Sequence, residues 1–259
     1  MISQGLVGFF DILGYQNIID NNTIEEVSKI ITEVLFSLPG AVMAEMKKGH
    51  CEPVWDKMKM KLKNLEATLI SDSILVVLAL DLKKSVWEKL FSVSLFERYI
   101  EGLMGATFRE GLPVRGAIDF GDYFVEDRSF AGKPIINCYR LGQSLDFSGG
   151  VMTKECSAVM DSVLLACRKE DADACEVWEG FMGYDYLCPL RDQKWERHRV
   201  IDWSLWTGDE MKDVRGSVFK AFKDHNKDVG PDVIRKMENT EMMLRFFKSK
   251  WKVSGVKGK

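Results

Sequence analysis

Residues 5–14 read GLVGFFDILG and place one carboxylate, Asp11, inside an apolar run. A run of this length, with aromatic and branched residues and with Gly5 and Gly14 at its ends, predicts a buried strand. An ionised carboxylate in or at the tip of such a strand is unfavourable unless a positive group pairs with it. The alternative is that Asp11 is a helix N-cap, a position at which Asp is favoured. A second carboxylate in a similar setting favours the charged site over the cap.

That second carboxylate is Asp72, in the segment 67–80, which reads ATLISDSILVVLAL. Two apolar runs flank Ser71, Asp72 and Ser73, and this pattern predicts two strands joined by a tight turn. Asp is also common as a plain turn residue, which is the alternative role for Asp72.

The rest of the chain up to residue 169 alternates between helical and strand patterns. Thr23 and Glu26 have the spacing of a capping box and predict the start of a helix that ends at Pro39-Gly40. The other expected elements are a short helix over 15–20, a helix over about 84–109, a hairpin over 114–125 that turns near Gly121, a helix from about Ile135, and a core strand over 157–160 followed by a helix through Arg168. This order predicts an α+β fold in which helices pack on a largely antiparallel sheet.

Residues 170–259 are expected to form an extension packed on the same domain, so that the main domain spans 1–169. Residues 183–190 (GYDYLCPL) and 197–205 (RHRVIDWSL) predict an extra hairpin, and residues 207–252 predict helices. The chain ends in a basic tail that we expect to be solvated.

Composition restricts the classes of partner. The chain has 259 residues, 46% of them apolar and 29% charged, with a net charge of −3. This charge gives no basic field for nucleic acid, and the longest stretch without charged residues, Val34–Ala44, is too short to span a bilayer. Six cysteines without a C-x-x-C pair and the absence of a signal-peptide pattern predict a cytoplasmic protein with reduced thiols.

Four charged residues lie next to or within apolar segments: Asp11, Asp72, Arg115 and Arg140. Two carboxylates at neighbouring strand ends form a hard oxygen site suited to Mg²⁺ or Mn²⁺. Metals held there can clamp a triphosphate, and arginines can stabilise the charge that develops during phosphoryl transfer. Each residue also has a structural alternative, since Arg115 can be a surface strand residue and Arg140 a solvated helix position.

These residues and their neighbours resemble the motifs of the class III nucleotidyl cyclases. That family opens with F-x-D-I-x-G-F, similar to residues 9–15 (FFDILGY), and has a G-D turn, similar to Ser71-Asp72. Its R-x-G-x-x-x-G hairpin is similar to 115–121, with the inner glycine displaced to Gly116, and its G-x-x-V-N-x-A-x-R motif keeps the same interval between Gly132 and Arg140. The resemblance covers about residues 4–168 and implies a ferredoxin-like cyclase homology domain.

The resemblance implies roles for the matching residues. Asp11 and Asp72 would hold two Mg²⁺ or Mn²⁺ ions per active site, with the Ile12 carbonyl as a further ligand. Backbone amides of Leu13, Gly14 and Tyr15 would cradle phosphates.

The resemblance also implies that Arg115 contacts the triphosphate and that Arg140 stabilises the transition state. The catalytic asparagine falls at Ile136, one position before Asn137, and Asn137 is the candidate for its role. The family works as head-to-tail dimers, which implies a homodimer with two composite sites.

Two positions concern recognition of the nucleotide base. The lysine and the aspartate that read adenine in adenylyl cyclases fall at Thr68 and Ser129. A site built to hydrogen-bond one base rejects analogues that leave its polar groups unpaired, so ATP and GTP become less favoured than UTP or CTP. This pattern resembles the pyrimidine cyclases of bacterial Pycsar antiphage defence, which make cyclic UMP or cyclic CMP for a separate effector protein. The alternatives are an adenylate or guanylate cyclase of the same fold, and a degenerate cyclase-like domain that binds a nucleotide without catalysis.

Overall fold

The central strand of the structure is the one that the segment around Asp11 predicts. The structure is a computed structural model that describes residues 2–48, 52–127, 129–179 and 182–254. Strand β1 (Ile2–Ile12) runs through the middle of the sheet and pairs antiparallel with β3 (Ser73–Ala79) on one side and β4 (Val114–Glu126) on the other. The register places Asp11 between Ser73 and Arg115.

The sheet has the strand order β2-β3-β1-β4-β6-β8-β7, with β5 paired to β4. All of its pairs are antiparallel except the parallel pair of β4 with β6. Helices connect β1 to β2 and β3 to β4, and the order β2-β3-β1-β4 is that of a ferredoxin-like β-α-β-β-α-β unit. The predicted α+β class with a largely antiparallel sheet is therefore confirmed.

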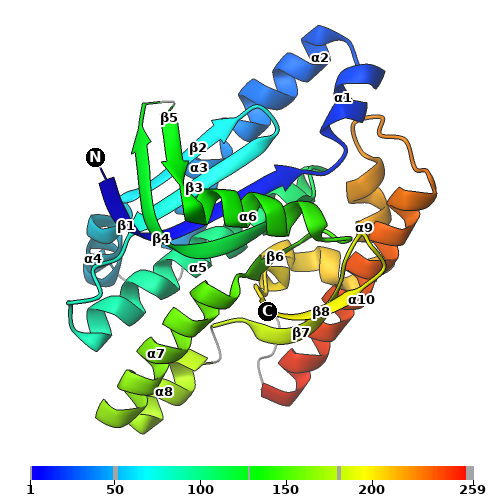
Figure 1. Ribbon diagram of the computed structural model, residues 1–259. Coiled ribbons are helices and arrows are strands. Elements are labelled where there is room, and N and C mark those ends of the chain that lie inside the picture. Colours follow the sequence, from blue (N-terminus) through cyan, green and yellow to red (C-terminus); the bar gives the residue numbers. More distant parts are fainter. Residues whose placement is uncertain (1, 49–51, 128, 180–181, 255–259) are drawn as a thin grey trace.

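Helices cover both faces of the sheet (Figure 1). On one face lies the long helix α5 (Val86–Arg109), and a Cβ atom on Gly8 of β1 would lie 3.4 Å from its Ile100 side chain. On the other face lies α6 (Lys133–Ser144), where a Cβ on Gly142 would come within 3.0 Å of the Gly116 Cα of β4. This close approach requires glycine and brings the last turn of α6 beside Asp11 and Arg115.

The remaining elements of the first 180 residues complete these layers. They are α1 (Tyr15–Asn21), α2 (Ile24–Lys29), the π-helical segment η1 (Ile30–Leu35), α3 (Leu38–Lys47), α4 (Glu52–Leu62), β2 (Leu65–Ile70), β5 (Ser129–Gly132), β6 (Gly149–Met152), α7 (Lys154–Glu170) and α8 (Ala172–Glu179). The predicted capping box at Thr23 and Glu26 is present, and so is the predicted helix that becomes α5.

The C-terminal part of the chain continues the same sheet. Strands β7 (Tyr184–Pro189) and β8 (Trp195–Val200) form the predicted hairpin, and β8 joins β6 through the pair Val151–Val200. The 3₁₀ segment η2 (Ser204–Asp213) and helices α9 (Val214–Lys223) and α10 (Pro231–Ser254) follow, and α10 packs two phenylalanines on Tyr184.

The predicted hairpin turn near Gly121 is wrong. Strand β4 runs without interruption from Val114 to Glu126, and Gly121 pairs with Gly5 in the middle of the ladder. A side chain on its partner Gly5 would overlap the Leu78 carbonyl oxygen of β3, so Gly5 marks close packing of β1 on β3. The hairpin turn comes later, between β4 and β5.

The predicted core strand over 157–160 is also wrong, because these residues lie in α7. Thr153 caps that helix by accepting a hydrogen bond from the Cys156 amide. The buried side chains Cys156, Met160 and Val163 recur at helical spacing. The last core strand of the main domain is β6, which precedes the helix.

Pro39 and Gly40 begin a helix and do not end one. They lie in the first turn of α3, where the missing amide of proline is tolerated. The stretch Ile24–Lys47 is, in the described chain, the one that by length and composition alone could cross a membrane. Within it Leu38 and Val42 are buried in the core, whereas most of the stretch is not buried.

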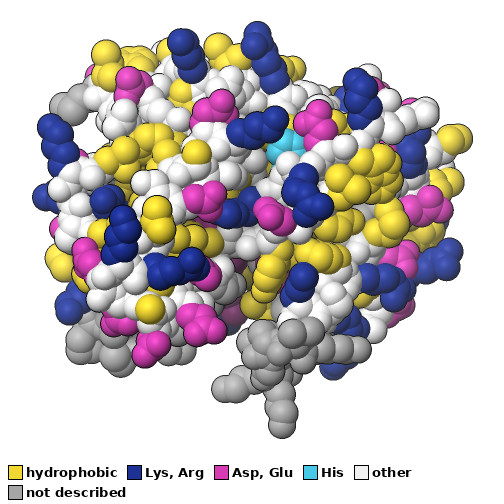
Figure 2. Space-filling view, turned by 60° about the horizontal axis from the view of Figure 1, so that its bottom comes forward, with side chains coloured by type: hydrophobic (Ala, Val, Ile, Leu, Met, Phe, Trp, Pro, Cys, Tyr) yellow, Lys and Arg dark blue, Asp and Glu magenta, His cyan; other side chains and the backbone are white. Residues whose placement is uncertain are grey.

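The surface carries charges of both signs. On the face shown in Figure 2, acidic and basic side chains lie interspersed around smaller apolar patches. The described cysteines, 138, 156, 167, 175 and 188, are buried and free, as the composition predicts. Of the basic tail, residues 255–259 lie outside the described part of the chain.

Candidate active site

Asp11 lies at the end of β1 in an ion pair with Arg115 of β4. The Arg115 Nη2 atom lies 3.3 Å from Asp11 Oδ2, and the two side chains are only 6% and 18% exposed. Gln143 of α6 joins both, since its Nε2 donates to the same Asp11 oxygen (3.1 Å) and its Oε1 accepts from Arg115 Nη2 (2.7 Å). Asp11 is therefore a strand residue, as predicted, and not a helix N-cap. No side chain caps α1.

Asp72 occupies the tight turn between β2 and β3, as predicted. Its carbonyl accepts from the Ile12 amide (2.8 Å), which holds the turn against the end of β1. Ser71, where the family motif has glycine, takes a left-handed φ of 56°. The turn thus keeps the backbone shape that a glycine would allow, despite the substitution.

The two carboxylates are electrostatically coupled. Burial raises the pKa of Asp11, the Arg115 charge lowers it, and the negative charge of Asp72 raises it again. Burial and the Asp72 charge also raise the pKa of Tyr15. A cation between the two carboxylates would relieve this repulsion.

The oxygen atoms at this site fit a metal ion that takes its remaining ligands from a substrate and from water. In the part of the chain that is described, no group of three or more His, Cys, Asp or Glu side chains forms a complete metal site. Mg²⁺ needs only one or two carboxylates when substrate phosphates and waters supply the rest. Arg115 and Gln143 both bond Oδ2 of Asp11, and Oδ1 accepts no hydrogen bond from the described residues. The residues that would hold the metals are Asp11, Asp72 and the Ile12 carbonyl.

The predicted phosphate loop lies between β1 and α1. Leu13 and Gly14 line a cavity of about 180 Å³ together with Asp11 and Arg115. The Leu13 amide donates to the Pro113 carbonyl (2.8 Å), so in this structure it is not free to donate to a phosphate. The amides of Gly14 and Tyr15 remain candidates.

Asn137 lies away from Asp11, on the part of α6 that faces the middle of β4. Its Nδ2 donates to Asp119 Oδ2 (2.9 Å), and the other oxygen of this buried carboxylate accepts from Thr153 and from the Phe120 amide. Asp119 is four residues after Arg115 and lies on the same face of β4. Because side chains alternate between the two faces of a strand, this shared face can be predicted from the sequence.

Arg140 lies on the exposed face of α6, beside other exposed side chains. Ile136 is 49% exposed, and Tyr139, which is 52% exposed, makes an edge contact with Phe9. Arg140 makes no hydrogen bond or ion pair with Asp11 or Asp72 of its own chain in the described structure. One chain by itself does not bring the predicted transition-state arginine to the predicted metal carboxylates.

The predicted base-reading residues lie on different strands. Thr68 of β2 is half-buried and pairs with Leu75, while Ser129 of β5 is exposed and pairs with Glu126. Glu126 is eleven residues beyond Arg115 along β4, which at about 3.3 Å per residue is roughly 35 Å. Ser129 therefore does not share a pocket with the Asp11 of its own chain.

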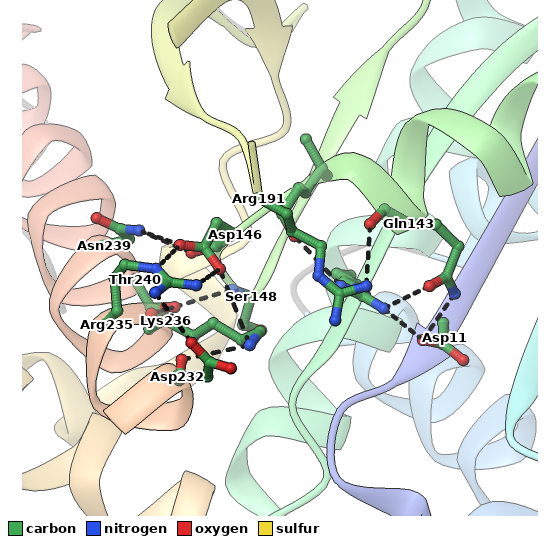
Figure 3. A network of polar contacts seen from close by, with 12 residues as sticks. Asp11, Gln143, Asp146, Ser148, Arg191, Asp232, Arg235, Lys236, Asn239 and Thr240 are labelled. Carbon is green, nitrogen blue, oxygen red and sulfur yellow. Dashed lines mark hydrogen bonds and ion pairs between the residues drawn. The ribbon is translucent and has the colours of Figure 1, made fainter. Parts of the chain in front are cut away.

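The C-terminal part supplies site residues that the sequence patterns do not indicate. Arg191 from the β7–β8 turn, Lys227 from the α9–α10 loop and Lys236 from α10 line the same cavity as Asp11. Figure 3 shows Arg191 and Lys236 with Asp11. Gln143 could have been predicted as a neighbour of the site, because it follows Arg140 by one helical turn. The lysines could not, because only tertiary packing brings them to β1.

No family model and no curated protein sequence matches the chain. Among solved structures, the adenylyl cyclase CyaB from P. aeruginosa is similar with a TM-score of 0.42 and 15% identity, over 78% of this chain and 95% of that one. The guanylyl cyclase Cya2 is similar with a TM-score of 0.36 and 14% identity, over 64% of this chain and 79% of that one. Similarity at this level assigns no activity to this chain.

Proposed function

We propose that the protein is a nucleotidyl cyclase that converts a pyrimidine nucleoside triphosphate, UTP or CTP, into the 3′,5′-cyclic nucleotide and pyrophosphate. The observation that carries the proposal is the convergence of Asp11, Asp72 and Arg115 at one end of β1. Two coupled carboxylates beside a buried guanidinium are the groups that a metal-bound triphosphate requires.

The proposed reaction is an internal displacement at phosphorus. The ribose 3′-oxygen forms a bond to the α-phosphorus, and the bond from that phosphorus to the oxygen bridging to the β-phosphate breaks. Pyrophosphate leaves with the electron pair, and the hydroxyl proton passes to solvent water. Divalent metal ions held by Asp11 and Asp72 would neutralise the phosphates and acidify the attacking hydroxyl.

Arg115 orients the phosphate chain in this proposal. Its guanidinium is already fixed by Gln143 and by the Leu145 carbonyl (3.2 Å), so little side-chain freedom is lost when a phosphate binds. Arg140 would stabilise the developing charge from the partner subunit of a homodimer. The exposed position of Arg140 and the distance of Ser129 from Asp11 support a site shared between two chains.

The choice of a pyrimidine rests on Thr68 and Ser129. Each hydroxyl donates or accepts, which suits the O2, N3 and O4 or N4 edge of uracil or cytosine. A role in antiphage signalling, in which a separate effector reads the cyclic nucleotide, follows from the same resemblance and completes the proposal.

One observation favours a second candidate, a nucleotide-binding domain without catalysis. The amide of Asn137 is engaged with the buried Asp119, and the family's asparagine position holds Ile136. A domain of this kind would bind a nucleoside triphosphate and release it unchanged.

Incubation with each of the four NTPs and Mn²⁺, followed by mass analysis, tests the proposal. We expect cyclic UMP or cyclic CMP together with pyrophosphate. Cyclic AMP or cyclic GMP as the main product would leave a cyclase of different specificity. Binding without any cyclic product would select the second candidate.

A further inference from the structure

The cavity beside Asp11 is built by two parts of the chain that are far apart in the sequence. The end of β1 and the loop before α1 form one wall, and the β7–β8 turn, the α9–α10 loop and α10 form the other. Its volume of about 180 Å³ is below the roughly 300–1,000 Å³ typical of pockets that enclose a whole small ligand. The cavity thus has room for part of a nucleotide only.

Four cationic side chains line this small volume: Arg115, Arg191, Lys227 and Lys236. Burial lowers the pKa of Lys236, and the charges of Arg191 and Arg115 lower it further, although Asp146 acts in the opposite direction. Burial also lowers the pKa of Arg115; the Asp11 charge opposes this effect and the Arg191 charge adds to it. These cations therefore repel one another across the cavity.

Acidic groups act against this repulsion: the charge of Asp232 acts to raise the pKa of Lys236, and the charge of Asp224 opposes the burial that lowers the pKa of Lys227. Asp11 pairs with Arg115, and the cavity-lining Asp228 accepts from Asn21 (3.2 Å). Asp146 is bound closely by Arg235 (2.5 Å), and its distance to Lys236 is longer, 3.8 Å.

The cations differ in how their donors are used. Lys227 donates to the carbonyls of Gly111 (2.5 Å) and Ala221 (2.8 Å), so it contributes charge and holds the loop in place. Besides its ion pair with Asp146, Lys236 donates one long hydrogen bond to the Asp232 carbonyl (3.3 Å), and Arg191 Nη1 donates one to the Gln143 carbonyl (3.5 Å). The buried Nε of Arg115 has no hydrogen-bond partner in the described structure. Donors for an anion are therefore present on both walls.

We propose that Lys236 and Arg191 bind the terminal phosphates of the substrate, and the pyrophosphate product, opposite Arg115. This inference rests on the proposed function and assigns the C-terminal segment to the active site of its own chain. A polyphosphate is the ligand class that fits, because several separated cations surround a volume too small for a nucleoside.

Equilibrium binding of inorganic pyrophosphate to the full-length chain, measured by calorimetry with and without Mg²⁺, tests the inference. The variants are Lys236→Met and Arg191→Met, with Lys236→Arg as the charge-conserving form. Lys220→Met on the exposed side of α9 is the matched control. We expect each loss of a cation to weaken binding by roughly 10- to 100-fold, the scale of one charge-assisted hydrogen bond. Lys236→Arg and Lys220→Met should bind within about threefold of the wild type.

The outcomes separate this inference from the proposed function. Folded Lys236→Met and Arg191→Met proteins that bind pyrophosphate as tightly as the wild type would overturn it, and so would a wild type that binds none. Normal cyclic nucleotide synthesis by both variants with an unchanged KM would overturn it while the cyclase proposal stands. Pyrophosphate binding that depends on both residues, without a cyclic product from any NTP, would support it and refute the cyclase proposal.

Discussion

Asp11 and Arg115 face each other across the ladder of β1 and β4, with Arg115 Nη2 3.3 Å from Asp11 Oδ2. Both side chains are largely buried, so each is the main counter-charge of the other. Loss of one partner leaves the other charge unpaired in a place where desolvation is unfavourable. Gln143 reduces this effect on the Arg115 side, because it would still accept from the guanidinium after Asp11 is neutralised.

The first prediction concerns the metal carboxylates. Asp11→Asn and Asp72→Asn should each reduce cyclic nucleotide formation by at least roughly 100-fold, because the site loses a hard anionic ligand. Product is measured by mass analysis, and circular dichroism checks the fold. Asp122→Asn, at an exposed position of β4, is the control that should keep wild-type activity.

Metal removal gives an independent readout of the same site. Excess EDTA should stop turnover, and added Mn²⁺ or Mg²⁺ should restore it. Wild-type activity in EDTA would show that the carboxylates act without a metal.

The second prediction concerns the homodimer. If the site is composite, Asp11→Asn chains and Arg140→Ala chains are each inactive alone, and their mixture regains up to one working site per heterodimer. The measurement is product formation after subunit exchange, with exchange verified by mass spectrometry of the complex.

The control mixture combines Asp11→Asn chains with chains that carry both substitutions, and it should stay inactive. If the first mixture is also inactive despite proven exchange, Arg140 acts on the carboxylates of its own chain.

Local patterns predicted most of the fold. The β2–β3 hairpin, the capping box at Thr23 and helix α5 each follow from short-range periodicity and turn chemistry. The errors came where a local signal had another cause. Gly121 lies within the unbroken ladder of β1 and β4 and not in a turn, and the apolar residues over 157–160 belong to a helix that Thr153 caps.

The site was predictable to the extent that its residues lie in short motifs. Asp11, Asp72 and Arg115 meet because adjacent strands place them in register, which alternation along a strand allows one to anticipate. Lys227 and Lys236 line the same cavity only because tertiary packing brings the α9–α10 loop and α10 to the end of β1. No periodicity in their own segment predicts that contact.

The third prediction concerns the base. In a competition of the four NTPs at equal concentration, UTP or CTP should be used at least ~100-fold better than ATP, the scale of one or two lost buried hydrogen bonds. UTP is our choice between the two, from the resemblance. Cyclic AMP or cyclic GMP as the main product would refute the roles given to Thr68 and Ser129.

The fourth prediction concerns the buried Glu101 of α5. This side chain accepts from Trp206 Nε1 (3.1 Å) and from Arg98 Nη1 (3.0 Å). Burial raises its pKa to about 7, although Arg98 acts in the opposite direction. Between about pH 4.5 and pH 7 the folded protein therefore binds a proton that the unfolded chain has released, so the free energy of unfolding falls as pH rises through this window.

The test compares the pH dependence of urea unfolding for the wild type and Glu101→Gln, whose amide oxygen still accepts from Trp206. From pH 4.5 to pH 7 the wild type should lose about 3 kcal/mol relative to the variant, the equivalent of a shift of about 2.5 pKa units. Above about pH 8, roughly one unit beyond the folded-state pKa, the difference should stay constant, because both states have then released the proton. Glu238→Gln, at an exposed position of α10, is the control and should show a flat difference. An equally flat difference for Glu101→Gln would mean that Arg98 keeps Glu101 ionised throughout this range.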